Sequence, residues 1–254
     1  MTSTLATIRE HGLIAVMEGA EPERVFSWAL AVSRGGIELL AIPVTLKNAT
    51  EVVSDLDDVE DVNLIVGISG VLHPEQVSIA VAAGAEFLIT PIFDPFIVEA
   101  AKSRGLVTIV GASTPTEVRA AIETQADMVI VHPIGIVGKP VEYFRNLQRT
   151  FPDVTLGVSG EIDVELAPAL LEVGAAAALV DRGVFPDSDD PSALDIITMR
   201  ATALVEVSAE VMGMPSRASF SDIRPSEIPE VDLDTLEQRL SMSDIDIVES
   251  DIVE

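Results

Sequence analysis

Asp127-Met128-Val129-Ile130-Val131-His132-Pro133 is the stretch that decides the fold. Four apolar residues, three of them β-branched, stand between an acidic residue and a His-Pro turn. A short apolar run bounded by turn residues is typical of a strand buried on both faces, as in a parallel sheet. The stretch therefore predicts a buried parallel strand that ends at His132.

Similar apolar runs recur along the chain and alternate with segments of helical spacing. Such alternation demands a parallel sheet, and eight units close best into a (β/α)8 barrel, the TIM-barrel fold. A doubly wound open sheet is the alternative, but no G-x-G-x-x-G motif follows the first strand. The expected strands are 13–17, 37–43, 63–67, 87–90, 107–110, 128–132, 155–158 and 177–181, and the expected helices are 21–33, 74–83, 95–104, 115–124, 141–151, 163–172 and 194–211.

The helix at 115–124 has an explicit start signal. Thr114 precedes Pro115, and Glu117 follows three residues after the threonine. A threonine and a glutamate at this spacing bond to each other's backbone N–H groups, which predicts a capping box.

Composition narrows the possible chemistry. The 254 residues are 48% hydrophobic and only 4% aromatic, which suits buried parallel strands between Ala-rich helices. No cysteine is present, so disulfides, thiolate nucleophiles and Cys-ligated metals are excluded. We expect no cofactor. The first residues show no signal-peptide pattern, and no apolar run reaches about 18 residues, so we expect a cytoplasmic protein without a membrane span.

The net charge is −27, from 42 acidic and 15 basic residues. Such a surface repels nucleic acid and anionic membranes, because binding to phosphates depends on Lys and Arg. The acidity has two explanations: solubility or a salt-adapted proteome, or a functional surface for a basic partner. Only Lys47, Lys102 and Lys139 are lysines, which leaves few candidates for Schiff-base chemistry.

The composition changes after residue 211. We expect a barrel domain at 1–211 and an acidic tail at 212–254, where the triplet Ser-Asp-Ile occurs three times and 11 acids face 3 bases. Acidic residues that alternate with β-branched ones suit a strand that adds to a partner's sheet edge. The alternative is a disordered, solvating tail.

In a barrel of this kind, the working face lies at the C-terminal ends of the strands. The candidate substrate-binding residues there are polar or charged: Glu18, Lys47, Ser69, His132, Ser159, Glu161 and Arg182.

Several motifs, in unbroken order from Leu13 to Pro186, resemble the KDPG/KHG aldolase family. No single motif is specific, but the whole set is. It comprises Gly35-Gly36-Ile37, Ala41-Ile42-Pro43, Val66-Gly67, Pro74-Glu75-Gln76, Ala82-Ala83-Gly84-Ala85-Glu86-Phe87, Thr90-Pro91, Asp94-Pro95, Val98-Glu99-Ala100-Ala101, Thr114-Pro115-Thr116-Glu117-Val118, His132-Pro133 and Phe151-Pro152-Asp153-Val154.

The resemblance implies a (β/α)8 barrel, usually a homotrimer, that cleaves 2-keto-3-deoxy-6-phosphogluconate or 4-hydroxy-2-oxoglutarate through a lysine Schiff base. The family's lysine falls on Ile130, which forms no imine, and its glutamate falls on Ala41, which moves no proton. The chain is therefore a divergent member that lacks the Schiff-base lysine, and neither position supplies a catalytic residue.

Four further positions around the expected mouth depart from the family. Its first-strand arginine falls on Glu18, and a Gly-Ala-Gly-Thr turn has become the sequence 67–70. The phosphate turn has become Ser159-Gly160-Glu161, and a second phosphate element has become Asp181-Arg182. A carboxylate near a phosphate is electrostatically unfavourable.

These changes predict a pseudoenzyme, that is, a non-catalytic scaffold that binds a protein partner through residues 212–254. The alternative is a lyase that still cleaves a 2-oxo acid at a rearranged site, with or without a metal ion. A sensor that binds small molecules without chemistry is a third hypothesis. The weak metal-ligand candidates are Glu18, His132, Glu161 and Asp181.

Overall fold

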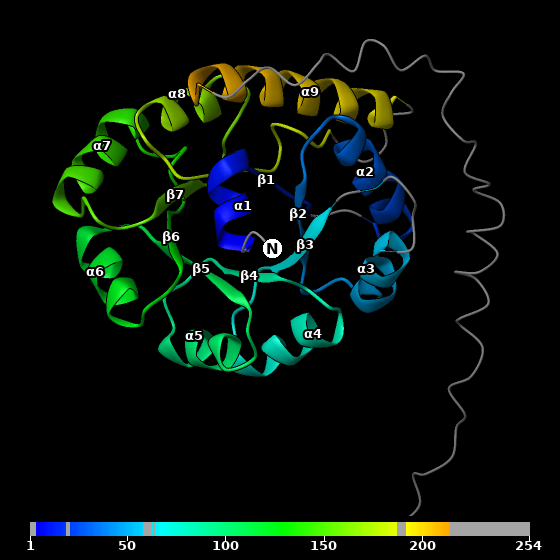
Figure 1. Cartoon of the computed structure of the whole chain (residues 1–254), viewed down its shortest axis with the longest axis horizontal. Helices are drawn as coiled ribbons and strands as arrows, with labels where there is room; N and C mark the ends of the chain where they lie inside the picture. Colours follow the sequence, from blue (N-terminus) through cyan, green and yellow to red (C-terminus); the bar gives the residue numbers. More distant parts are fainter. Residues whose placement is uncertain (1–3, 19–20, 58–61, 63, 187–191, 214–254) are drawn as a thin grey trace, which may run out of the picture. The chain divides into compact units, whose positions relative to one another are not determined.

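The computed structural model describes residues 4–18, 21–57, 62, 64–186 and 192–213 (Figure 1). Within these residues, parallel strands pair in chain order from β1 to β8, and β8 pairs with β1 to close a barrel. The strands are β1 Leu13–Val16, β2 Leu39–Pro43, β3 Ile65–Ser69, β4 Phe87–Thr90, β5 Val107–Ala112, β6 Met128–Val131, β7 Leu156–Ser159 and β8 Ala178–Val180. The predicted TIM-barrel fold is confirmed.

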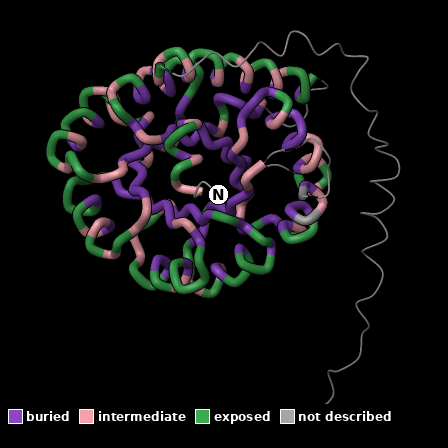
Figure 2. Tube along the Cα trace, in the orientation of Figure 1, coloured by how far each residue is buried: buried purple, intermediate pink, exposed green. Residues whose placement is uncertain are grey.

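Helices surround this barrel, so that the strands form a buried ring and the outer helix faces are exposed (Figure 2). In the described residues, no helix is long and apolar enough to cross a membrane. The helices are α1 Thr4–His11, α2 Pro22–Arg34, α3 Ala49–Asp57, η1 Pro74–Gln76, α4 Val77–Ala82, α5 Pro95–Lys102, α6 Pro115–Glu123, α7 Pro140–Thr150, α8 Leu166–Glu172 and α9 Ala193–Val211.

The stretch around β6 occupies the place that its sequence predicts. Met128 and Ile130 are both 1% exposed and belong to a cluster of apolar side chains that includes Ile109 and Leu179 from other strands. Val129 and Val131, which alternate with them, belong to the separate core between the strands and the helices. Both faces of the strand are therefore apolar, which explains the continuous hydrophobic run.

Helix α1 fills one end of the barrel and was not predicted. It precedes β1 and lies across the centre of the strand ring (Figure 1). Its Ile8 is fully buried in the same interior cluster as Ile14, Leu39 and Phe87. The N-terminal end of the barrel is therefore closed by protein, which leaves the C-terminal end as the mouth.

Several predicted boundaries differ from the structure. The third strand begins at Ile65 rather than at residue 63 and continues to Ser69, because it pairs along the whole of β2 from Leu39 to Pro43. Helix α3 had no predicted range. The domain boundary at 211 stays a prediction, and the tail beyond Gly213 lies outside the described residues.

Candidate functional site

The candidate residues at the mouth differ in how far they are buried. Ser69 is buried, while His132, Ser159 and Asp181 are half-buried. Glu18, Lys47, Glu161 and Arg182 are exposed and lie beyond the strand ends. These residues form a polar layer at the C-terminal ends of the strands, next to the apolar barrel interior.

His132 directly follows β6 and is held by both neighbouring strands. Its backbone N–H donates to the carbonyl of Ala112 at the end of β5, with N and O 3.1 Å apart. A Cβ atom built on Gly160, after β7, would lie 3.1 Å from the imidazole Nδ1. Nδ1 is buried and has no hydrogen-bond partner in the described structure. A buried polar atom without a partner is unfavourable, and Asn48 Oδ1 and Ser208 Oγ are in the same state among the described residues.

Ser69 is a buried polar residue at the C-terminal end of β3. Ser69 is 4% exposed. Two residues earlier, Gly67 faces the barrel interior, since a Cβ there would lie 2.3 Å from the Phe87 ring. Side chains two residues apart on a strand share a face, so Ser69 points to the same interior side at the mouth.

The turn after β7 is fastened to the turn after β6. Ile134 donates its N–H to the Ser159 carbonyl at 2.9 Å, and Gly135 donates to the Gly160 carbonyl at 3.0 Å. Glu161 follows with a φ of 54°, a left-handed conformation that is uncommon for glutamate. Its exposed carboxylate therefore stands at the rim.

Asp181 and Arg182 follow β8. The Asp181 carboxylate accepts a hydrogen bond from the Arg182 backbone N–H at 2.6 Å, which fixes its orientation. The described residues contain no group of three or more His, Cys, Asp or Glu side chains placed to hold a metal ion. Glu18, His132, Glu161 and Asp181 are therefore not gathered into one cluster, and metal binding stays a prediction.

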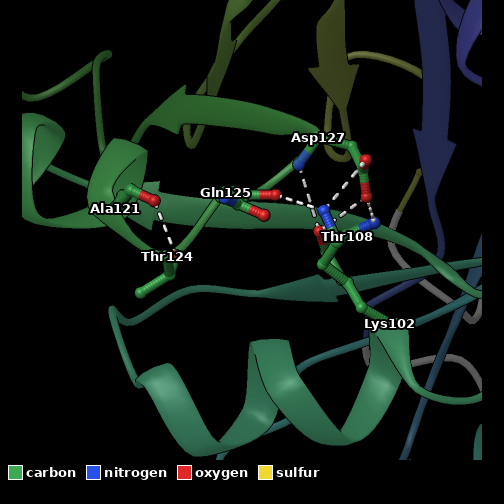
Figure 3. Close-up of polar contacts among 6 residues, drawn as sticks. All are labelled: Lys102, Thr108, Ala121, Thr124, Gln125 and Asp127. Atoms are coloured by element: carbon green, nitrogen blue, oxygen red, sulfur yellow. Dashed lines mark hydrogen bonds and ion pairs between the residues drawn. The ribbon is translucent and has the colours of Figure 1, made fainter.

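None of the lysines lies inside the described barrel. The Lys102 ammonium is 3.6 Å from Asp127 Oδ1 and also donates to the Gln125 carbonyl, while Asp127 Oδ2 accepts from Thr108 (Figure 3). Asp127 precedes β6, so this network lies at the N-terminal end of the barrel, away from the mouth. Lys139 is exposed and forms an ion pair with Glu142 at 3.1 Å. Lys47 is exposed in the loop that follows β2.

The two positions where the resemblance implies catalytic side chains are apolar and buried. Ala41 on β2 is 0% exposed and Ile130 on β6 is 1% exposed, and both belong to the barrel-interior cluster. An imine on strand β6 at position 130 is therefore ruled out by the residue itself.

The sequence profile of KDPG and KHG aldolase matches residues 5–195. The chain belongs to the KDPG and KHG aldolase family. Among curated relatives, 2-dehydro-3-deoxy-6-phosphogalactonate aldolase of Escherichia coli K12 is 25% identical over 65% of this chain and 80% of its own. The 2-dehydro-3-deoxy-phosphogluconate aldolase of Treponema pallidum Nichols is 30% identical over 43% of this chain and 52% of its own.

Solved structures of the family share the fold. The native KDPGal structure superposes with a TM-score of 0.71 at 22% identity, over 80% of this chain and 96% of that one. The 2-keto-3-deoxy-6-phosphogluconate aldolase of Zymomonas mobilis ZM4 gives a TM-score of 0.70 at 18% identity, over 81% and 96%. At these identities the likeness shows the fold alone.

The prediction of a non-catalytic scaffold that has lost aldolase activity is wrong. The relatives of this KDPG and KHG aldolase family member are named aldolases, and nothing in the comparisons indicates lost activity. The physical error lay in treating the loss of the family's lysine and glutamate, together with four further changes around the mouth, as loss of the reaction. Aldol cleavage needs a stabilised enolate, and hydrogen-bond donors or cations other than a lysine imine can stabilise developing charge.

Proposed function

We propose that this chain is a lyase that cleaves a 4-hydroxy-2-oxo acid to pyruvate and an aldehyde at the C-terminal mouth of the barrel. Membership of the family over residues 5–195 carries the proposal, together with curated relatives that are named aldolases. The substrate class is that of these relatives, sugar-derived 2-oxo acids. Because Ile130 and Ala41 stand where the family has its lysine and glutamate, the proposed site uses other residues.

The reaction makes three demands on the site. A base must take the proton of the C4 hydroxyl, so that the C3–C4 bond breaks and the aldehyde leaves. The electron pair moves onto the C2 carbonyl oxygen as an enolate, which needs hydrogen-bond donors or a cation. An acid must then protonate C3 to give pyruvate.

The polar layer supplies groups for each demand. In our proposal the His132 imidazole moves the proton, because it is a half-buried acid–base group that directly follows β6 at the mouth. The Ser69 hydroxyl donates to the enolate oxygen from its buried place on β3. Lys47 attracts the substrate carboxylate from the β2–α3 loop, and Ser159 and Arg182 contact the rest of the substrate. A divalent ion near Glu18, Glu161 or Asp181 is the metal-assisted form of the same proposal.

The test is pyruvate release from 2-keto-3-deoxy-6-phosphogluconate, its galactonate epimer and 4-hydroxy-2-oxoglutarate, each with EDTA and with Mg²⁺ or Mn²⁺. We expect turnover in at least one arm. His132→Asn is expected to lower kcat by about 10²- to 10⁴-fold, as loss of a general acid–base does.

The matched control for this variant is His11→Asn, because His11 pairs with Glu38 at 3.2 Å and precedes β1, at the end of the barrel opposite the mouth. The control is expected to keep the wild-type kcat. No pyruvate from any substrate in any arm, or equal activity of both variants, contradicts the proposal.

We further propose that the chain assembles as a homotrimer, as the family resemblance implies. Three large apolar side chains support an interface between copies: Leu72 before η1, Ile92 after β4 and Phe96 on α5, which are 43%, 42% and 68% exposed. Exposed apolar side chains that lie near one another mark protein contacts more often than isolated ones do. Helix α5 packs against η1, which brings these segments together.

Phe96→Asp is expected to shift the mass measured by light scattering from three chains toward one, because the carboxylate loses its hydration in an apolar contact. Met199→Asp on α9 is the matched control, since Met199 is 64% exposed and lies on another side of the barrel. A wild-type mass of a single chain contradicts the trimer, and an unchanged mass in the Phe96 variant contradicts this interface.

A further inference from the structure

Two hydrogen bonds, one donated and one accepted by the same serine, join the two ends of the loop that carries His132. The loop runs from His132, after β6, to Lys139, before α7. At its beginning, the Ser113 hydroxyl donates to the His132 carbonyl. Just beyond its end, the Tyr143 hydroxyl on α7 donates to the Ser113 carbonyl. Ser113 therefore links the beginning of the loop to the helix that follows it.

Ser113 is itself fixed by the start of the next helix. The Glu117 carboxylate accepts hydrogen bonds from the backbone N–H groups of Ser113 at 2.8 Å and Thr114 at 2.9 Å. These two bonds, the one from Ser113 first, lower the pKa of Glu117 below its ordinary value, so the acceptor stays ionised and the bonds persist at neutral pH. The backbone of Ser113 is therefore held in place by the first turn of α6.

On its other side, the loop lies against the turn after β7. The Ile134–Ser159 and Gly135–Gly160 backbone bonds described above join these two turns. A glycine is required at 160, because its φ is 91° and a Cβ there would lie 2.8 Å from Pro133. His132 is therefore held between two fixed strand ends.

We propose that Ser113 is a positioning residue for His132, with Tyr143 as its anchor on α7. This inference rests on the proposed lyase function, in which the imidazole touches the reacting hydroxyl. Ser113 touches no substrate atom; it fixes the main chain from which the imidazole extends. A displacement of about 1 Å in a reacting group can cost about 10²-fold in rate.

The experiment compares Ser113→Ala, Ser113→Thr and Ser103→Ala in the full chain. Ser103 is the matched control, because it is also exposed and its hydroxyl also donates to a backbone carbonyl, that of Ala100 at 2.9 Å, far from the mouth. We expect Ser113→Ala to lower kcat by about 10- to 100-fold with KM within about twofold, as a misplaced reacting group does. Threonine keeps the hydroxyl and is expected to restore kcat, and Ser103→Ala is expected to behave as wild type.

A second readout needs no turnover. With ¹³C-labelled histidine, the imidazole signal of His132, assigned through His132→Asn, is expected to be single in wild type and broadened or split in Ser113→Ala and Tyr143→Phe. The signals of His11 and His73 serve as internal references. An unchanged His132 signal in Ser113→Ala overturns the positioning role whether or not the protein releases pyruvate.

If wild type releases no pyruvate but the His132 signal responds to both substitutions, the lyase proposal fails while the positioning of His132 stands. If wild type is active and Ser113→Ala keeps full kcat, the positioning role fails while the lyase proposal stands.

Discussion

Ile130 is a residue whose place in the fold is predictable from the sequence although it supplies no catalytic group. Its burial was evident from the sequence, since it lies in the middle of an apolar run, and the structure places it at 1% exposure inside the barrel. Ser113 and Tyr143 show the opposite case. No sequence pattern predicts that a tyrosine on α7 bonds to a serine after β5, because the contact arises only when the barrel closes.

Lysine at position 130 is expected to destabilise the protein strongly. Ile130→Lys places an ammonium in the apolar cluster that holds Ile109, Met128 and Leu179, and an unpaired buried charge costs about 3–5 kcal/mol. The free energy of unfolding in urea measures this loss. Ile130→Met is the control, since exchanges between apolar residues of similar volume cost less than about 1.5 kcal/mol. Equal unfolding free energies of the lysine variant and wild type would contradict the burial of residue 130 in the apolar interior of the barrel.

Helix α6 was the most predictable element, whereas α1 was missed. The capping box of α6 is formed as predicted, with the Thr114 hydroxyl accepting from Glu117 N–H at 3.3 Å and the Glu117 carboxylate accepting from Thr114 N–H. A cap is a local arrangement, so residues three apart suffice to predict it. Helix α1 is short, and Ile8 is buried only because the finished barrel offers an apolar end to cover.

The α6 cap makes a pH-dependent contribution to stability. Because the bonds from Ser113 and Thr114 lower the pKa of Glu117 below 4.5, the folded state releases this proton more readily than the unfolded state. The stabilisation is therefore complete above pH 4.5 and is lost as the pH falls through the lowered folded-state value.

Glu117→Gln keeps an acceptor oxygen but loses the charge, so this variant isolates the pH-dependent part of the cap. Wild type is expected to exceed it in unfolding free energy by about 0.3–0.5 kcal/mol near pH 7, a small value because solvent screens this exposed group. The difference is expected to vanish in urea titrations near pH 3. Glu99→Gln on α5 is the control, since Glu99 is also exposed on a helix. A difference that does not depend on pH contradicts the argument.

At the scale of the whole molecule, the fold was predictable because strand and helix alternation constrains a long chain at many points at once. The site was not, because it depends on a few contacts between loops, such as those of Ser159 and Gly160 with the β6–α7 loop. The mistaken scaffold hypothesis had the same origin. The sequence shows that Ile130 replaces the family's lysine, but it does not show which polar side chains gather at the mouth, because that depends on how the loops after the strands pack.

The charge of the whole chain predicts how salt affects catalysis. A net charge of −27 repels an anionic 2-oxo acid, and more strongly one that also carries a phosphate. Salt shortens the Debye length from about 30 Å at about 0.01 M to about 3 Å at about 1 M, so the repulsion weakens. We expect kcat/KM for the phosphorylated substrate to rise severalfold over this range, and that for 4-hydroxy-2-oxoglutarate to rise less. Pyruvate release measured across a sodium chloride series tests this, with potassium chloride as a check on ion identity. A kcat/KM that falls with salt for the phosphorylated substrate would show that local cations at the mouth, such as Lys47 and Arg182, outweigh the charge of the rest of the molecule.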